Sequence, residues 1–151
     1  ITDAQSKRYT LLIELRSKGY PKRLKIEIRR SIKNCDYQET IAYSRFDTKQ
    51  VALKAHTLDQ TMTNKINAFL DRGEIRDCFD IEFLLRRGIA LPTDIGKKAG
   101  RLLKKIESFK DRDFKVKLGS IIEAEAREYY VTQRFSYLKD KISAASSHTG
   151  A

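Results

Sequence analysis

The apolar residues of this chain change their spacing near residue 56, and this change limits the folds that the chain can adopt. Upstream, the segment RLKIEIRR at residues 23–30 alternates strictly and places Leu24, Ile26 and Ile28 on one side, which is typical of a strand with one buried face. Downstream, apolar residues recur at helical spacing. We therefore expect an α+β protein, in which a small antiparallel or mixed sheet fragment precedes a C-terminal helical bundle.

The N-terminal part of the chain predicts a hairpin. Residues 8–16 (RYTLLIELR) are rich in β-branched and aromatic side chains, and we expect them to pair with residues 23–30 across a loop longer than two residues. Shorter extended segments are expected at 41–46 and 51–53. Because two or three strands with one apolar face make a poor free-standing sheet, we expect the chain to be the C-terminal part of a longer protein, or a partner to complete the sheet.

The C-terminal part predicts four helices, of which the first begins at the N-cap Thr57. The expected helices span residues 57–71, 74–87, 93–109 and 116–142, the last one loosened near Gly119. Phe79, Phe83 and Leu84 are expected in the core. By organisation we divide the chain into residues 1–55, 56–91, 92–143 and a flexible tail at 144–151.

Composition excludes several classes of protein. Only two cysteines, Cys35 and Cys78, and two histidines, His56 and His148, are present, so a disulfide framework, a zinc site and a serine-protease-type triad are excluded. No signal peptide or membrane-spanning run is found, and we expect a reducing, cytoplasmic location without membrane contact. A net charge of +11 favours polyanionic ligands, either nucleic acid or polyphosphate.

Charged side chains that could take part in binding or catalysis lie between residues 65 and 80. Asp77 and Asp80 lie three residues apart and share one helix face. If the two helices pack antiparallel, Lys65 approaches that face. A lysine can hold phosphates there, and a carboxylate can fix a metal, a base or the lysine itself. The alternative is structural: Arg76 and Asp80 form an ordinary surface pair, and Asp77 pairs with Arg72 or Arg76.

The same stretch resembles the AbiEii/AbiGii abortive-infection toxin nucleotidyltransferases, members of the polymerase-β-like superfamily. The shared elements are Lys65, Arg72-Gly73, the run Arg76-Asp77-Cys78-Phe79-Asp80-Ile81, and Leu84-Leu85. The strand LKIEIRR matches a family strand whose single acidic residue, here Glu27, is a metal ligand. The resemblance covers residues 8–90 and implies that the sheet fragment belongs to a nucleotidyltransferase domain.

The resemblance implies an activity: transfer of a nucleoside monophosphate from an NTP to an acceptor hydroxyl with Mg²⁺, by a toxin of a type IV toxin–antitoxin pair. The implied partners are the NTP, tRNA or another RNA, and a cognate antitoxin. Lys65 would contact phosphate, Asp77 would orient the lysine or the substrate, and Asp80 would steady them. Arg76 is either a second nucleotide contact or structural, and Glu27 is either a metal ligand or a cross-strand partner of a basic residue.

One family motif is not found. A Gly-Ser turn followed by Asp-x-Asp on a strand does not precede residue 8, and the only Gly-Ser, at residues 119–120, is followed by Glu123 and Glu125 on a predicted helix. We expect these two glutamates to be solvated. Without that motif the two-metal site is incomplete, so the chain is expected to be the back half of an active site or a non-catalytic remnant.

The third predicted helix carries a basic side opposite its apolar residues. That side consists of Lys97, Arg101, Lys104 and Lys105. It is either an RNA-binding surface that neutralises phosphates or a solvated helix face. Tyr129 and Tyr130 could stack on bases or pack between helices. The competing hypothesis for the whole chain is therefore a non-catalytic basic module that binds RNA or a partner protein.

Overall fold

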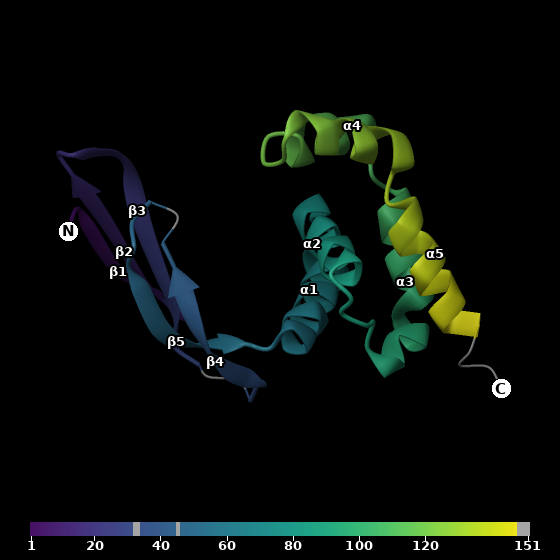
Figure 1. The fold of residues 1–151 in the computed structure, drawn as a ribbon, viewed down its shortest axis with the longest axis horizontal. Helices are drawn as coiled ribbons and strands as arrows, with labels where there is room; N and C mark the ends of the chain where they lie inside the picture. The colour runs from purple at the N-terminus through teal and green to yellow at the C-terminus, as the bar shows by residue number, and fades with distance from the viewer. Residues whose placement is uncertain (32–33, 45, 148–151) are drawn as a thin grey trace. The chain divides into compact units, whose positions relative to one another are not determined.

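The computed structural model describes residues 1–31, 34–44 and 46–147, and it confirms the α+β class. The chain divides into two compact units, Ile1–Cys35 and Asp36–Ala151 (Figure 1). The boundary between them falls within the predicted segment 1–55. The first unit is a sheet, whereas the second contains a hairpin and all the helices.

The first unit is an antiparallel meander in the order β1-β2-β3. Its strands are β1 (Asp3–Ser6), β2 (Thr10–Ser17) and β3 (Tyr20–Arg29). The predicted hairpin is confirmed, with Ile13 opposite Ile26. The expected long loop is wrong: Ser17 pairs with Tyr20, so only two residues connect the strands. Pro21 lies at the start of β3 rather than in the turn, a strand position that proline tolerates.

The alternation in β3 separates an apolar face from a polar one, as predicted. Leu24, Ile26 and Ile28 share one face and remain 57%, 37% and 49% exposed. Glu27 lies on the opposite face, where its register partner is Leu12. The sheet therefore presents an uncovered apolar side within this unit, as expected of a sheet with so few strands.

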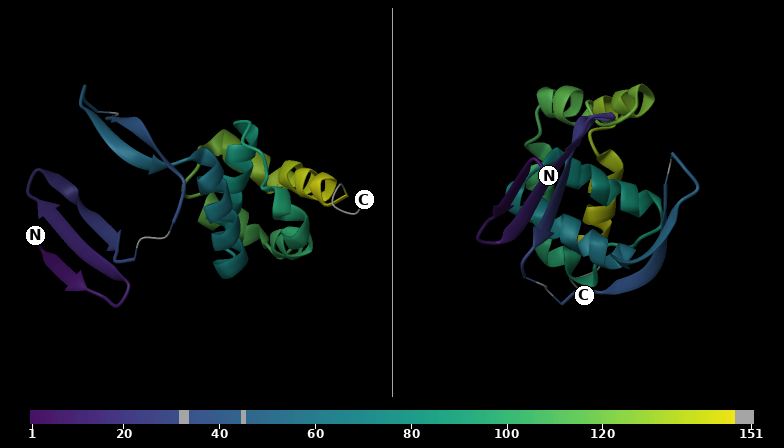
Figure 2. Two further views of the ribbon diagram at one scale, coloured as in Figure 1. Left: turned by 90° about the horizontal axis from the view of Figure 1, so that it is seen from below. Right: turned by 90° about the vertical axis from the view of Figure 1, so that its left-hand side faces the viewer.

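The second unit begins with a hairpin and continues directly into a helix (Figure 2). Strands β4 (Tyr37–Tyr43) and β5 (Gln50–His56) pair antiparallel. Thr57 follows β5 and caps α1 (Leu58–Arg72), as predicted, by accepting a 3.1 Å hydrogen bond from the backbone N–H of Gln60.

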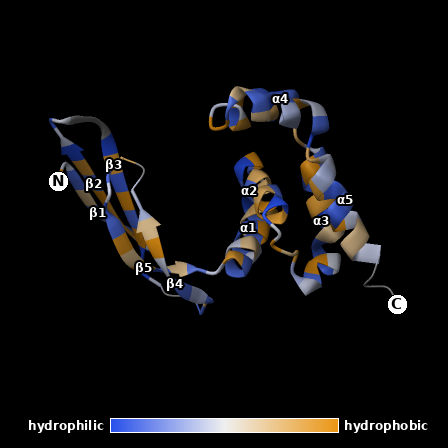
Figure 3. Ribbon diagram, viewed as in Figure 1, coloured by the Kyte–Doolittle hydropathy of each residue, from blue (hydrophilic) through white to orange (hydrophobic). Residues whose placement is uncertain are grey.

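The remaining helices enclose one hydrophobic core, and their apolar residues form bands along the ribbon (Figure 3). They are α2 (Ile75–Arg86), a 3₁₀ turn η1 (Thr93–Ile95), α3 (Gly96–Glu107), a π-helical segment η2 (Asp113–Leu118), α4 (Ala124–Gln133) and α5 (Ser136–Ser147). Within the predicted core set, Leu84 is buried and Phe79 is half-buried, but Phe83 is 46% exposed. The prediction that Phe83 lies in the core is therefore wrong.

The single helix predicted over residues 116–142 is wrong. The chain forms η2, α4 and α5 instead, and only the break near Gly119 was expected. A second break follows α4, because Arg134 and Phe135 both have positive φ, 47° and 59°. That conformation is unfavourable for these residues, but Phe135 is fully buried against the rings of Phe114 and Tyr130. Burial of the ring fixes the turn.

Residues 144–147, the first part of the predicted flexible tail, belong to α5. The rest of the predicted tail, which includes His148, lies outside the described residues.

Candidate functional site

A short turn between α1 and α2 brings the predicted site residues together. Gly73 ends α1 in the left-handed conformation, with φ 70°, and its N–H donates to the carbonyl of Phe69. Glu74 then precedes α2, so only two residues connect the helices. Glycine suits this position because it adopts positive φ without steric cost.

Lys65 on α1 reaches both carboxylates on α2, as the spacing predicts. Its Nζ lies 2.6 Å from Oδ2 of Asp80 and 3.5 Å from Oδ1 of Asp77. The Lys65 side chain is 33% exposed and that of Asp80 is 39% exposed, whereas Asp77 is almost fully buried. The arrangement is a cation held at the surface by one exposed and one buried carboxylate.

Asp77 also binds Arg72, the last residue of α1. Nε of Arg72 donates to Oδ2 at 2.6 Å and Nη2 donates to Oδ1 at 2.7 Å, a bidentate geometry suited to a carboxylate. The structural alternative for Asp77, pairing with Arg72, is therefore confirmed, and it coexists with the Lys65 contact. One buried carboxylate serves both cations.

The two carboxylates keep Lys65 charged. Partial burial would lower its pKa, but the hydrogen bond with Asp80 and the negative charges of Asp80 and Asp77 outweigh burial, and the net effect raises the pKa above its ordinary value. The hydrogen bond with Asp77 likewise raises the pKa of Arg72. A lysine that is charged at neutral pH can bind phosphate, but it cannot act as a base at that pH.

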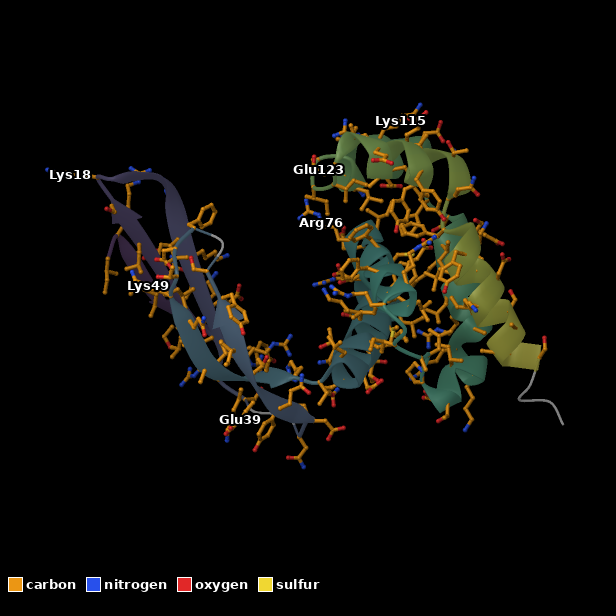
Figure 4. The ribbon with its side chains drawn as sticks, viewed as in Figure 1. Lys18, Glu39, Lys49, Arg76, Lys115 and Glu123 are labelled. Carbon is orange, nitrogen blue, oxygen red and sulfur yellow. The ribbon has the colours of Figure 1, made fainter. Side chains whose placement is uncertain are left out.

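Arg76 lies one residue before Asp77 but belongs to a different surface. It projects from the N-terminal end of α2 (Figure 4) and lines a surface hollow together with Arg72, Glu74 and Lys117. Across residues 1–31, 34–44 and 46–147, Arg76 takes part in no ion pair. The predicted Arg76–Asp80 pair is therefore wrong, because Asp80 binds Lys65 instead.

Glu27 belongs to the first unit, where it lies on β3. Its side chain is 55% exposed, and Nζ of Lys25 on the same strand lies 3.9 Å from its Oε2. It lines a hollow with Tyr9, Thr10, Arg29 and Ser31. No group of three His, Cys, Asp or Glu side chains in the described part of the chain could hold a metal ion.

The basic residues of α3 lie on two sides of that helix. Lys97, Arg101 and Lys104 are exposed, opposite the buried Leu102 and Ile106. Lys105 is half-buried instead, and a methyl group placed on Gly73 would lie 3.4 Å from its Nζ. Lys105 therefore lies against the end of α1, where a cation complements the helix dipole.

The sequence reasoning missed a buried carboxylate at the other end of α2. Glu82 has no exposed surface; it binds Arg86 at 2.9 Å, and its Oε2 accepts a hydrogen bond from the backbone N–H of Leu138 at 3.3 Å. Arg86 in turn lies over the rings of Tyr129 and Tyr137. The only sequence signal is the i,i+4 spacing of Glu82 and Arg86, which is equally typical of a surface pair.

Several minor expectations are settled by burial. Cys78 is fully buried, and burial raises the pKa of its thiol well above the ordinary value, so it is no nucleophile. Glu123 and Glu125 are exposed, as predicted, although Glu123 precedes α4 rather than lying within it. Tyr130 packs in the core, and Tyr129 is 38% exposed.

Comparison with known proteins identifies a family. A family model described as nucleotidyl transferase AbiEii toxin, type IV TA system, matches residues 2–142. The match includes the C-terminal helices, well beyond the stretch 8–90 on which the sequence resemblance rests. No curated protein and no solved structure matches the chain. Over the described residues, no helix is both long enough and apolar enough to cross a membrane.

Proposed function

The chain belongs to the AbiEii family of type IV toxin–antitoxin nucleotidyl transferases, and on that basis we propose that it supplies the phosphate-binding half of a nucleotidyltransferase site. In the proposed reaction, a hydroxyl oxygen of the acceptor bonds to the α-phosphorus of an NTP. The bond from that phosphorus to the bridging oxygen of pyrophosphate breaks. Pyrophosphate leaves, and the hydroxyl proton passes to solvent or a base.

One observation carries this proposal: the amine of Lys65 lies at the surface, two carboxylates hold it in place, and its raised pKa keeps it charged at neutral pH. Asp80 at 2.6 Å and Asp77 at 3.5 Å hold it in place, and Arg72 holds Asp77. Phosphoryl transfer depends chiefly on positioning and on neutralising the charge of the phosphates. A lysine oriented by two carboxylates supplies both, so we assign Lys65 to phosphate, Asp77 to orienting it and Asp80 to steadying it.

The magnesium expectation requires more carboxylates than these. Asp77 and Asp80 already bind cationic side chains, and the described residues contain no cluster of three metal-binding side chains. The described residues therefore do not form a complete Mg²⁺ site. We propose Glu27, among the described residues, as a single carboxylate ligand of such a metal ion.

The family assignment also supports proposals about partners and place of action. A cognate antitoxin protein is the expected partner of a type IV toxin. We further propose an RNA acceptor, because the chain carries a net charge of +11 and RNA offers both phosphates and free hydroxyls. Reaction with NTP and RNA would take place in the cytoplasm.

The test is nucleotide transfer by the full-length product of the gene that encodes this chain. RNA from a cell extract is incubated with each of four α-labelled NTPs, and label in RNA is counted. Lys65→Met should abolish transfer. Lys98→Met is the matched control, because Lys98 on α3 forms a comparable 2.8 Å pair with Asp94 in the η1 turn. Transfer that survives Lys65→Met would refute the assigned role.

A specific observation also favours the second hypothesis, a non-catalytic RNA-binding module. Lys97, Arg101 and Lys104 form an exposed basic row on α3 that does not involve Lys65. On this hypothesis RNA binding depends steeply on salt and is unchanged in Lys65→Met. Loss of RNA binding in a triple substitution of the row, without any transfer activity in the wild type, would favour this module.

A further inference from the structure

A second group of cations lies at the turn between α1 and α2, where it lines a surface hollow. Arg72, Arg76 and Lys117 line one surface hollow, together with a single acidic residue, Glu74. They come from three elements: the end of α1, the first turn of α2, and η2, which packs against α2. Their convergence therefore depends on the tertiary fold and is not a run of basic residues in the sequence.

The cations of this hollow retain unused hydrogen-bond donors. Arg72 uses Nε and Nη2 for Asp77, and its side chain is 58% exposed; no described residue binds its Nη1. Arg76 is exposed and forms no ion pair with the described residues. Lys117 binds Asp113 at 2.8 Å but keeps 56% of its side chain exposed, and an ammonium group has three donors.

We propose that Arg72, Arg76 and Lys117 form a phosphate-binding subsite for the nucleotide substrates of the enzyme. The inference rests on the proposed function, which it extends from one phosphate contact to a second, adjoining one. Two guanidinium groups and an ammonium around one hollow match the several oxygens of a phosphate. The phosphate belongs either to the triphosphate of the NTP or to the backbone of the acceptor RNA.

Arg72 connects this subsite to Lys65. The guanidinium that faces the hollow is the same group that binds Asp77, and Asp77 contacts Lys65. A polyphosphate or an RNA backbone that extends from Lys65 to the hollow would contact Lys65 first and then Arg72. Phosphates at Lys65 and at the hollow would then share one rigid support, the buried carboxylate of Asp77.

Glu74 allows a test in which a substitution should strengthen phosphate binding rather than weaken it. Its carboxylate lines the hollow, is exposed, and lies near enough to Arg72 and Lys117 to raise the pKa of each, though less than their main acidic partners do. A carboxylate beside bound phosphate repels it. Removing this charge should therefore strengthen phosphate binding, whereas removing the charge of Arg76 should weaken it.

The experiment measures binding of two probes to the full-length protein: inorganic triphosphate and a short single-stranded oligoribonucleotide. Arg76→Gln and Lys117→Gln should each weaken binding of at least one probe by roughly tenfold, and Glu74→Gln should strengthen it. For RNA, the slope of log K against log salt should fall by about 0.7 for each lost contact. Arg87→Gln, at the opposite end of α2, removes the same charge and should change nothing.

The outcomes separate the sources of the phosphate and the two proposals. An effect on triphosphate alone identifies the NTP, and an effect on RNA alone identifies the acceptor backbone. The subsite is refuted if Arg76→Gln binds both probes as Arg87→Gln does, or if Glu74→Gln weakens binding. Because binding is measured without transfer, a Lys65→Met protein that still labels RNA would refute the proposed function while leaving this subsite standing.

Discussion

Arg72 and Asp77 form a bidentate pair that joins the last residue of α1 to the first turn of α2, with bonds of 2.6 and 2.7 Å. Asp77 is 1% exposed and Arg72 is 58% exposed. The buried partner therefore depends on the exposed one for its hydrogen bonds. Because the same carboxylate contacts Lys65, the stability of the turn and the geometry of the candidate site depend on a single side chain.

Replacing Asp77 should therefore cost much more stability than replacing Asp80. Asp77→Asn removes a buried charge that binds two cations, and we expect the free energy of unfolding to fall by about 2 kcal/mol. Asp80→Asn removes one partly exposed pair and should cost less than about 1 kcal/mol. Urea unfolding followed by circular dichroism measures both. Equal costs would show that Asp77 is no more structural than Asp80.

Lys65 predicts a stability difference that disappears at high pH. Its pKa in the folded protein is raised above the ordinary value of 10.5, so its contribution is fully present below pH 10.5 and is lost as the pH rises through the folded pKa. The difference in unfolding free energy between wild type and Lys65→Met should therefore be constant near neutrality and shrink above that pH. A difference that persists in strong alkali would mean that the lysine stabilises by packing rather than by charge.

Glu82 should stabilise the start of α5 from a distance of 56 residues in sequence. Glu82→Gln keeps an oxygen for the N–H of Leu138 but weakens the pair with Arg86, and we expect a loss of about 1 kcal/mol. Glu82→Leu removes both interactions and should cost about 3 kcal/mol. Hydrogen exchange at Leu138 is the specific measurement. Unchanged protection there in Glu82→Leu would exclude the capping role.

The two cysteines should react differently with an alkylating reagent. Cys35 is partly exposed, whereas Cys78 is buried with a raised thiol pKa. In the native protein at pH 8 we expect rapid modification of Cys35 and none of Cys78, with both modified in urea. Peptide mass analysis after a timed reaction distinguishes them. Native modification of Cys78 at the rate of Cys35 would contradict the burial of α2 in the core.

The candidate site was predictable because helical geometry connects its residues locally. The periodicity around Lys65, the break at Gly73 and the three-residue spacing of Asp77 and Asp80 together specify which faces meet. The turn at Arg134 and Phe135 was not predictable, because neither residue type favours positive φ and only the tertiary burial of Phe135 holds it there.

The burial of the Glu82 carboxylate could not be predicted from the sequence either. Glu82 and Phe83 are neighbours on α2, and hydrophobicity places the phenylalanine inside and the glutamate outside. The structure shows the reverse, with Glu82 at 0% and Phe83 at 46% exposure, because Leu138 and Arg86 supply hydrogen-bond donors to the carboxylate inside the helical unit. A pattern of residue types does not contain that information.

Because only Gly73 and Glu74 connect α1 to α2, the geometry of the candidate site depends on the number of residues in this turn. Each residue of an α-helix advances the rotation by about 100°. One residue inserted between Gly73 and Ile75, or one deleted, would either rotate α2 against its packing or point Asp77 and Asp80 away from Lys65. Proteins that share this site can therefore exchange its side chains more readily than they can change the length of the turn, and single-residue insertions there should be strongly selected against.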